Sequence, residues 1–405
     1  MQQPQRGFEG RSTFVDALRG IAALSVACYH IFRYGPLPEP ASRVVPGILQ
    51  VWFDHGWIGV QVFFVISGFV IAYSVRNVRI TPGYVANYAL RRSIRLDPPY
   101  WSTILLVLLV HWVFHLHLGF DSPMDVPSPM ETPLTWMILL SHVLYLQNIL
   151  GFENLSAGFW TLCIEVQFYL MYVIGLGVAQ HLSHRSKAAS SDVGAVPLLA
   201  LFAPLAILSL FAWNSGLGSE LWRNAFASLG LDSVAAADPG QDYWITHFFC
   251  MFFLGSAAWW ALDRRVPPIV FWGYVGLMAV RLGGEWIIVR RWSLDLTIAL
   301  IAGIAIYLLG RRGRLGTTLN YRWLQYLGRI SYSLYLIHFP VAHVVTTLGY
   351  EHMTLNRTLA PWAAAAWLLA ALVASIAAAH LLYTFVEAPS VRLASRLKPK
   401  PSPAR

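Results

Sequence analysis

Ten stretches of the chain are apolar and long enough to cross a lipid bilayer, and no other feature limits its fold as strongly. A spanning helix needs about 20 consecutive, mostly apolar residues. The chain is 57% hydrophobic and only 12% charged, a composition typical of polytopic membrane proteins. We therefore expect an all-α, polytopic transmembrane helix bundle with about ten spanning helices. The predicted spans are residues 12–33, 57–75, 99–118, 159–180, 197–214, 244–262, 267–289, 293–310, 329–349 and 362–386.

The positive charges predict the topology and decide the status of an eleventh apolar stretch, residues 134–150. With ten spans and the N-terminus inside, the cytoplasmic loops and tails hold about 21 of the 29 Lys and Arg residues, in agreement with the positive-inside rule. Counting 134–150 as a span would place every later basic loop outside. We therefore predict that 134–150 is a re-entrant or interfacial helix and that both termini are cytoplasmic.

One transmembrane domain, residues 1–390, is expected to precede a basic cytoplasmic tail, residues 391–405. The formal charge of +9 is distributed as on the cytoplasmic face of a bilayer, so we expect a lipid partner and no nucleic acid. Cys28, Cys163 and Cys250 lie in apolar spans without metal-ligand or disulfide spacing. We interpret them as packing residues and predict no metal site.

The first span carries Asp16, Arg19 and His30, which a simple membrane anchor would lack. The three project from one side of a helix. Arg19 and His30 are 11 positions apart, which separates them by about 16 Å along the helix axis. Ionisable side chains in a bilayer are costly and usually face a cavity or a partner. The row indicates either a functional site or a buried ion pair with a histidine near the membrane surface.

Three arginines, Arg91, Arg92 and Arg95, precede Pro98 and Pro99 in the second cytoplasmic loop. If the segment is helical, Arg92 and Arg95 share a face, and the two prolines restart the chain into the third span. Clustered guanidinium groups bind phosphate bidentately, but an anchor that contacts lipid headgroups has the same composition. The sequence leaves both interpretations open.

Other spans also carry polar side chains. Glu165 lies near the outer end of the fourth span, where a carboxylate needs a partner. Tyr332, Tyr335 and His338 recur at roughly helical spacing in the ninth span. Glu387 stands at the cytoplasmic exit of the tenth span, and we expect it to pair with a nearby arginine.

Five stretches, in this order, resemble the acyltransferase 3 family of integral-membrane O-acyltransferases: VDALRGIAALSVACYH, GVQVFFVISGFVI, RRSIRLDPPYW, FWTLCIEVQFYL and RISYSLYLIHFP. The resemblance implies a multi-pass enzyme of the bacterial inner membrane. Such an enzyme transfers an acyl group, most commonly acetyl, from acetyl-CoA or another acyl-CoA to a hydroxyl group of a glycan. Several positions depart from the commonest family pattern and leave the subfamily and acceptor open: Ala17, Gln61, Asp97, Cys163 and Val166.

The resemblance implies that Arg19 and His30 are essential and that Arg92 and Arg95 handle acyl-CoA. We expect these two arginines, with Arg91, to hold the donor's phosphates at the cytoplasmic mouth. The pantetheine arm is about as long as the Arg19–His30 spacing and would run along the first helix. His30 would then act as general base, since the ordinary pKa of histidine lies near neutral pH.

Roles for the remaining candidate residues follow from their predicted depth. Asp16 is expected to pair with Arg19 and steady the channel mouth, and Glu165 to orient His30 or bind the acceptor. A covalent route, through an acyl-histidine or through an acyl-serine at Ser67 or Ser333, is an alternative. Two other functions remain open: acylation of a small-molecule glycoside such as a macrolide, and transport, for which paired repeats would be expected.

Overall fold

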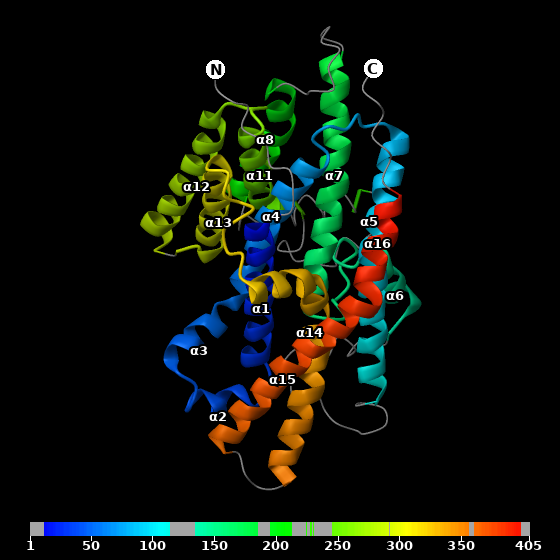
Figure 1. Ribbon diagram of the computed structural model, residues 1–405, viewed down its shortest axis with the longest axis vertical. Helices are drawn as coiled ribbons and strands as arrows, with labels where there is room; N and C mark the ends of the chain where they lie inside the picture. Colours follow the sequence, from blue (N-terminus) through cyan, green and yellow to red (C-terminus); the bar gives the residue numbers. More distant parts are fainter. Residues whose placement is uncertain are drawn as a thin grey trace.

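Each of the ten predicted spans overlaps a helix in the computed structural model, which describes residues 12–113, 134–184, 195–212, 224, 227–228, 230, 245–290, 292–355 and 360–397 (Figure 1). These helices are α1 (Thr13–Arg33), α4 (Gly59–Ser74), α5 (Pro82–His111), α7 (Phe159–His184), α8 (Ala195–Ala212), α11 (Ile245–Leu262), α12 (Pro268–Val289), α13 (Leu294–Arg311), α14 (Arg322–Leu355) and α15 (Pro361–Leu382). Residues 114–118, 213–214 and 244 of the predicted spans lie outside the described residues. No strand occurs in the described ranges. The predicted all-α membrane bundle is therefore confirmed.

Six of the described helical segments are long and apolar enough to cross a bilayer. They are formed by α1, α4, α7, α11, α13 and the run from α15 into α16 (Ala388–Arg396). The count of ten spans stays a prediction. α16 runs across the predicted domain boundary at residue 390, and residues 398–405 of the predicted tail lie outside the described residues.

The stretch at 134–150 contains a short helix, α6 (Trp136–Val143), of 8 residues. At about 1.5 Å per residue, such a helix is far too short to span a bilayer. Beyond it, the Leu155 main-chain N–H donates to His142 Nε2 over 3.1 Å, and the Cys163 thiol donates to the Tyr145 carbonyl over 2.8 Å. The segment is thereby attached to the beginning of α7.

The third predicted span is part of a much longer helix, because α5 begins at Pro82 and runs through Pro98 and Pro99. The expectation that these prolines restart the chain is wrong. Proline removes a main-chain N–H from a helix, but neighbouring side chains bind to this turn: the Tyr332 hydroxyl donates to the Leu96 carbonyl over 2.9 Å, and the Tyr145 hydroxyl to the Asp97 carboxylate over 3.0 Å. The three loop arginines therefore lie on a continuous helix.

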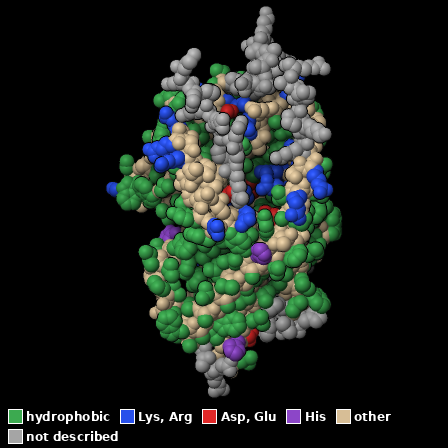
Figure 2. Space-filling view, in the orientation of Figure 1, with side chains coloured by type: hydrophobic (Ala, Val, Ile, Leu, Met, Phe, Trp, Pro, Cys, Tyr) green, Lys and Arg blue, Asp and Glu red, His purple; other side chains and the backbone are tan. Residues whose placement is uncertain are grey.

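Helix α1 lies between two groups of helices in Figure 1. One group contains α4, α8, α11, α12 and α13, and the other contains α14, α15 and two short helices, α2 (Pro38–Ser42) and α3 (Gly47–Asp54). On the face seen in Figure 2, Lys and Arg side chains gather in the upper half, around a recess that also contains Asp or Glu atoms. The lower half of that face is mostly hydrophobic.

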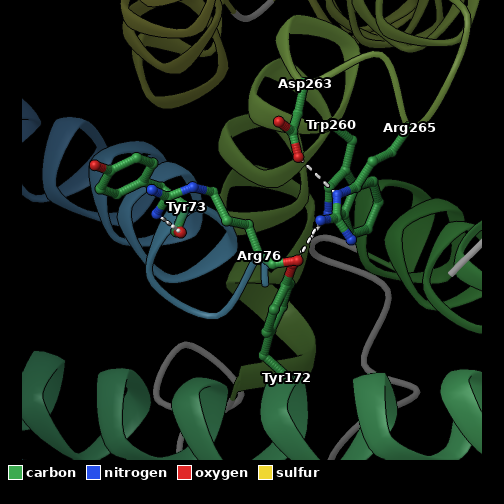
Figure 3. A network of polar contacts seen from close by, with 6 residues as sticks. All are labelled: Tyr73, Arg76, Tyr172, Trp260, Asp263 and Arg265. Atoms are coloured by element: carbon green, nitrogen blue, oxygen red, sulfur yellow. Dashed lines mark hydrogen bonds and ion pairs between the residues drawn. The ribbon is translucent and has the colours of Figure 1, made fainter. Parts of the chain in front are cut away.

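Arg265, just after α11, joins the end of this helix to the end of α4 (Figure 3). Arg265 donates to the Asp263 carboxylate over 2.7 Å and also to the main-chain oxygen of Arg76. The guanidinium carbon of Arg76 lies 4.0 Å from the centre of the Tyr73 ring. Part of the predicted cytoplasmic positive charge thus has a structural role.

Glycines allow α1 and α14 to pack with their backbones in contact. A Cβ atom on Gly20 would lie 2.7 Å from the Gly328 main-chain nitrogen, and one on Gly328 would collide with the Asp16 carbonyl oxygen. Small residues serve this purpose in membrane helices generally. The relative position of α1 and α14, and of every side chain between them, depends on this contact.

We expect Gly328→Val to destabilise the protein by ~1–3 kcal/mol or more, because backbone atoms cannot move aside as a flexible side chain can. The measurement is the thermal midpoint of the detergent-solubilised protein, followed by size-exclusion chromatography. Gly83→Val is the matched control, since a Cβ atom on Gly83 would have no atom within 4 Å. An unchanged midpoint for Gly328→Val would contradict the close approach.

Candidate functional site

A cavity of about 120 Å³ lies where α1, α4, α5, α7 and α14 converge. Its polar lining residues are Arg19, Ser67, Arg92, Arg95, Thr161, Glu165, Tyr169, Ser331, Tyr332 and Tyr335. The charged lining consists of three arginines and one glutamate. A cavity with excess guanidinium charge favours an anionic ligand.

The loop arginines differ in their surroundings. Arg92 lines the cavity, and its guanidinium carbon lies 3.6 Å from the centre of the Tyr169 ring. Its Nε atom is buried and has no hydrogen-bond partner in the described part of the chain. Arg95 also lines the cavity, whereas Arg91 does not and lies 5.9 Å from the Tyr84 ring centre. The predicted pair Arg92 and Arg95 is brought together with Arg19, and Arg91 is left outside.

The Glu165 carboxylate accepts two hydrogen bonds within the cavity. The Ser67 hydroxyl donates to its Oε1 atom over 2.7 Å, and the Tyr169 hydroxyl donates to the same atom. No hydrogen bond joins Glu165 to His30 in the described structure. The predicted partner of this carboxylate therefore exists, but it is the Ser67–Tyr169 pair and not His30. Ser67, which is named from the sequence only for the alternative covalent route, lines the cavity.

A second carboxylate, Glu387, is 6% exposed and lies in the π-helical turn between α15 and α16. Its Oε2 atom accepts from the Ser333 hydroxyl over 2.6 Å and from the Ser333 main-chain N–H over 3.2 Å. Arg19 and Arg95 both lie within electrostatic range of it. The carboxylate is thus bonded to Ser333, and no ion pair between Glu387 and an arginine is found in the described part of the chain, although the prediction was such a pair.

His30 contacts a histidine of α14. Its Nδ1 atom lies 2.9 Å from Nε2 of His338, and the two rings stack at a centroid distance of 5.1 Å. The Nδ1 atom of His338 lies 2.9 Å from the Leu334 carbonyl oxygen. The sequence places His338 among the polar points of its helix but does not assign it this partner.

Aromatic side chains surround His30 on its other sides. The ring of Tyr34 stacks on it at 5.8 Å, and Tyr29 and Phe339 meet it edge to face at 5.2 and 5.6 Å. On the inner side, Tyr335 lines the cavity and lies 6.1 Å from the His338 ring. Tyr335 thus connects the arginine-lined cavity with the histidine pair.

Asp16 is not among the residues that line the cavity. Its main-chain oxygen faces Gly328 at the α1–α14 contact. The three residues of the predicted row on α1 therefore have different surroundings: Arg19 reaches the cavity, His30 reaches His338, and Asp16 lies at the beginning of the helix.

We expect Glu165→Gln to strengthen binding of CoA by about fivefold, equivalent to ~1 kcal/mol, because it removes a negative charge from the cavity while an amide oxygen still accepts from Ser67. Isothermal titration with CoA measures this. Glu39→Gln, which removes an exposed carboxylate paired with Arg43 over 2.8 Å, is the control and should leave the affinity unchanged. Weaker CoA binding by Glu165→Gln would contradict this electrostatic account.

Comparison with known families supplies one match. The model of a family described as an acyltransferase domain matches residues 12–384, nearly the whole chain. No curated protein matches, and no solved structure does.

Proposed function

The chain belongs to the acyltransferase 3 family, and we propose that it moves an acyl group, most simply acetyl, from cytoplasmic acyl-CoA to a sugar hydroxyl of an extracytoplasmic or membrane-associated glycan. Family membership makes it a membrane O-acyltransferase. We propose the rest: the acyl donor, the acyl group, the acceptor, and a location in the bacterial inner membrane with both termini inside.

The arginine-lined cavity is the observation that carries the choice of donor. CoA carries several phosphate groups, and guanidinium groups bind phosphate through strong, charge-assisted hydrogen bonds. Arg19, Arg92 and Arg95 all line the cavity. The Nε atoms of Arg91 and Arg92 are both buried without a partner among the described residues, but only Arg92 lines the cavity. The guanidinium groups of Arg19, Arg92 and Arg95 that line the cavity would donate to the phosphate oxygens of the acyl donor.

His30 is the proposed general base. Its Nε2 atom takes the proton of the acceptor hydroxyl as the oxygen attacks the thioester carbonyl. The carbon–sulfur bond then breaks, and the proton passes from His30 to the departing thiolate. The products are the acylated sugar and CoA with a free thiol, so no further reactant is required.

The aromatic rings beside His30 favour a sugar as the acceptor. Tyr34 and Phe339 both contact the His30 ring, and aromatic side chains offer broad apolar faces with polar edges. A sugar ring packed on such faces can present a hydroxyl group to the base. This arrangement is also open to a glycosylated small molecule, which the experiment below separates.

The experiment uses membranes that contain the full chain, radiolabelled acetyl-CoA, and a panel of oligosaccharides, lipid-linked glycans and a macrolide glycoside. We expect an alkali-labile, labelled ester on a glycan. Label on the macrolide alone would support the small-molecule alternative. Label on the protein before any acceptor is added would support the covalent route through Ser67. Absence of acyl transfer to the whole panel, by protein that is folded, would contradict the proposal.

A further inference from the structure

We propose that His338 is a positioning residue that holds His30 in the tautomer a general base requires. The inference rests on the proposed function of His30 and adds a residue that neither the family match nor the sequence motifs assign to this task. It is carried by hydrogen-bond chemistry at two consecutive contacts, each 2.9 Å long.

The first contact fixes the tautomer of His338. A carbonyl oxygen can only accept a hydrogen bond, so the contact between His338 Nδ1 and the Leu334 carbonyl requires a proton on Nδ1. A neutral imidazole carries a proton on one nitrogen only. The Nε2 atom of neutral His338 is therefore an acceptor.

The second contact, between His338 and His30, then fixes which nitrogen of His30 carries the proton. Because His338 Nε2 accepts, His30 must donate from Nδ1 across the 2.9 Å contact. The proton of neutral His30 is thereby held on Nδ1, and its Nε2 lone pair stays free to take a proton from a hydroxyl group. The Val26 carbonyl, one turn earlier on α1, also interacts with the His30 side chain, so His338 adds a second acceptor, from another helix, that holds the ring in this orientation.

The same hydrogen bonds exclude onward transfer of a proton through His338 to Leu334. A relay would need the Nδ1 proton of His338 to move on to Leu334, but a peptide carbonyl is far too weak a base to accept it. His338 is also held in place: its side chain is fully buried, its carbonyl accepts from the Ser375 hydroxyl over 3.3 Å, and α14 is packed against α1 at Gly328. It orients His30 and does not carry its proton away.

The test compares His338→Gln with His338→Asn, two amides of similar polarity. The glutamine amide reaches the position of Nε2 and offers His30 an acceptor, whereas the asparagine amide reaches only the position of Nδ1. We expect kcat for transfer from radiolabelled acetyl-CoA, to the acceptor that the wild type acylates, to fall about 10–100-fold in His338→Asn. His338→Gln should retain most of it, and KM for acetyl-CoA should be unchanged in both.

Equal losses in the two variants would assign His338 a packing role, and wild-type kcat in His338→Asn would remove any role; either result overturns the inference. CoA affinity measured on the same preparations confirms folding. His30→Ala, assayed in parallel, separates the two proposals. If His30→Ala is inactive while His338→Asn is fully active, only the positioning role fails. If His30→Ala is fully active, the general-base assignment fails and the positioning role fails with it.

Discussion

His30→Ala is expected to lower the rate of acyl transfer by about 10²–10⁴-fold, the usual contribution of a general base. The affinity for CoA should stay within about twofold of the wild type, because the arginine-lined cavity is built from other side chains. Both measurements use purified protein: an assay of acyl transfer to the acceptor gives the rate, and titration with CoA gives the affinity.

The matched control is His55→Ala. His55 is exposed, and its Nδ1 atom lies 2.8 Å from the Val51 carbonyl oxygen, on the short segment after α3. The His55→Ala variant should transfer acyl groups at the wild-type rate. Undiminished transfer by His30→Ala would remove the base from the mechanism, and a parallel loss of CoA affinity would show that the substitution disturbs the whole bundle.

Arg92→Ala is expected to weaken binding of CoA by about 10–100-fold, which corresponds to the ~1.5–3 kcal/mol of a hydrogen bond to a charged group. The reason is that the Arg92 side chain lines the cavity, whereas that of Arg91 does not. At a saturating concentration of acyl-CoA, kcat should change little. The loss is measured by isothermal titration with CoA.

Arg91→Ala supplies the control from the same helix. Arg91 carries the same charge, but it does not line the cavity. We expect its removal to change CoA affinity by less than about threefold. Equal effects of Arg91→Ala and Arg92→Ala would indicate a diffuse electrostatic contribution and would favour the lipid-anchor interpretation of the loop.

The three arginines that line the cavity can be predicted from sequence to lie together. Arg19 stands at the beginning of a span and Arg92 and Arg95 at the end of a segment predicted to be cytoplasmic, so the positive-inside rule predicts that all three lie at one membrane face. The rule predicts how deep a residue lies in the membrane but not which side of its helix the residue occupies. Since each residue turns a helix by about 100°, it could not tell that Arg92 faces the cavity and Arg91 does not.

The partner of His30 could not be predicted, because it depends on how two distant helices pack. His30 and His338 are 308 positions apart, and they meet because Gly20 and Gly328 bring α1 against α14. A sequence pattern finds polar residues at helical spacing but not which helix they face. For the same reason the pattern indicates that Glu165 needs a partner but does not identify it: of the two predicted roles, orienting His30 or binding the acceptor, neither names Ser67 and Tyr169, which donate to this carboxylate.

The extent of α5 escapes prediction for a local reason. Two consecutive prolines normally end or kink a helix, and the pattern contains no sign that Tyr332 and Tyr145 would bind to that turn. The continuous helix has a functional consequence, because it fixes Arg92 and Arg95 relative to the membrane-embedded part of α5. A flexible loop would not hold the two guanidinium groups at the cavity wall.

The most direct test of the account is a cryo-electron microscopy structure of the protein with a non-hydrolysable acyl-CoA analogue. We expect the phosphate groups to contact Arg92 and Arg95, and the pantetheine arm to pass Tyr335. The carbonyl carbon should lie about 3–3.5 Å from where an acceptor oxygen, hydrogen-bonded to His30 Nε2, would attack. A nucleotide bound away from the arginine-lined cavity, or an acyl group remote from His30, would contradict the account.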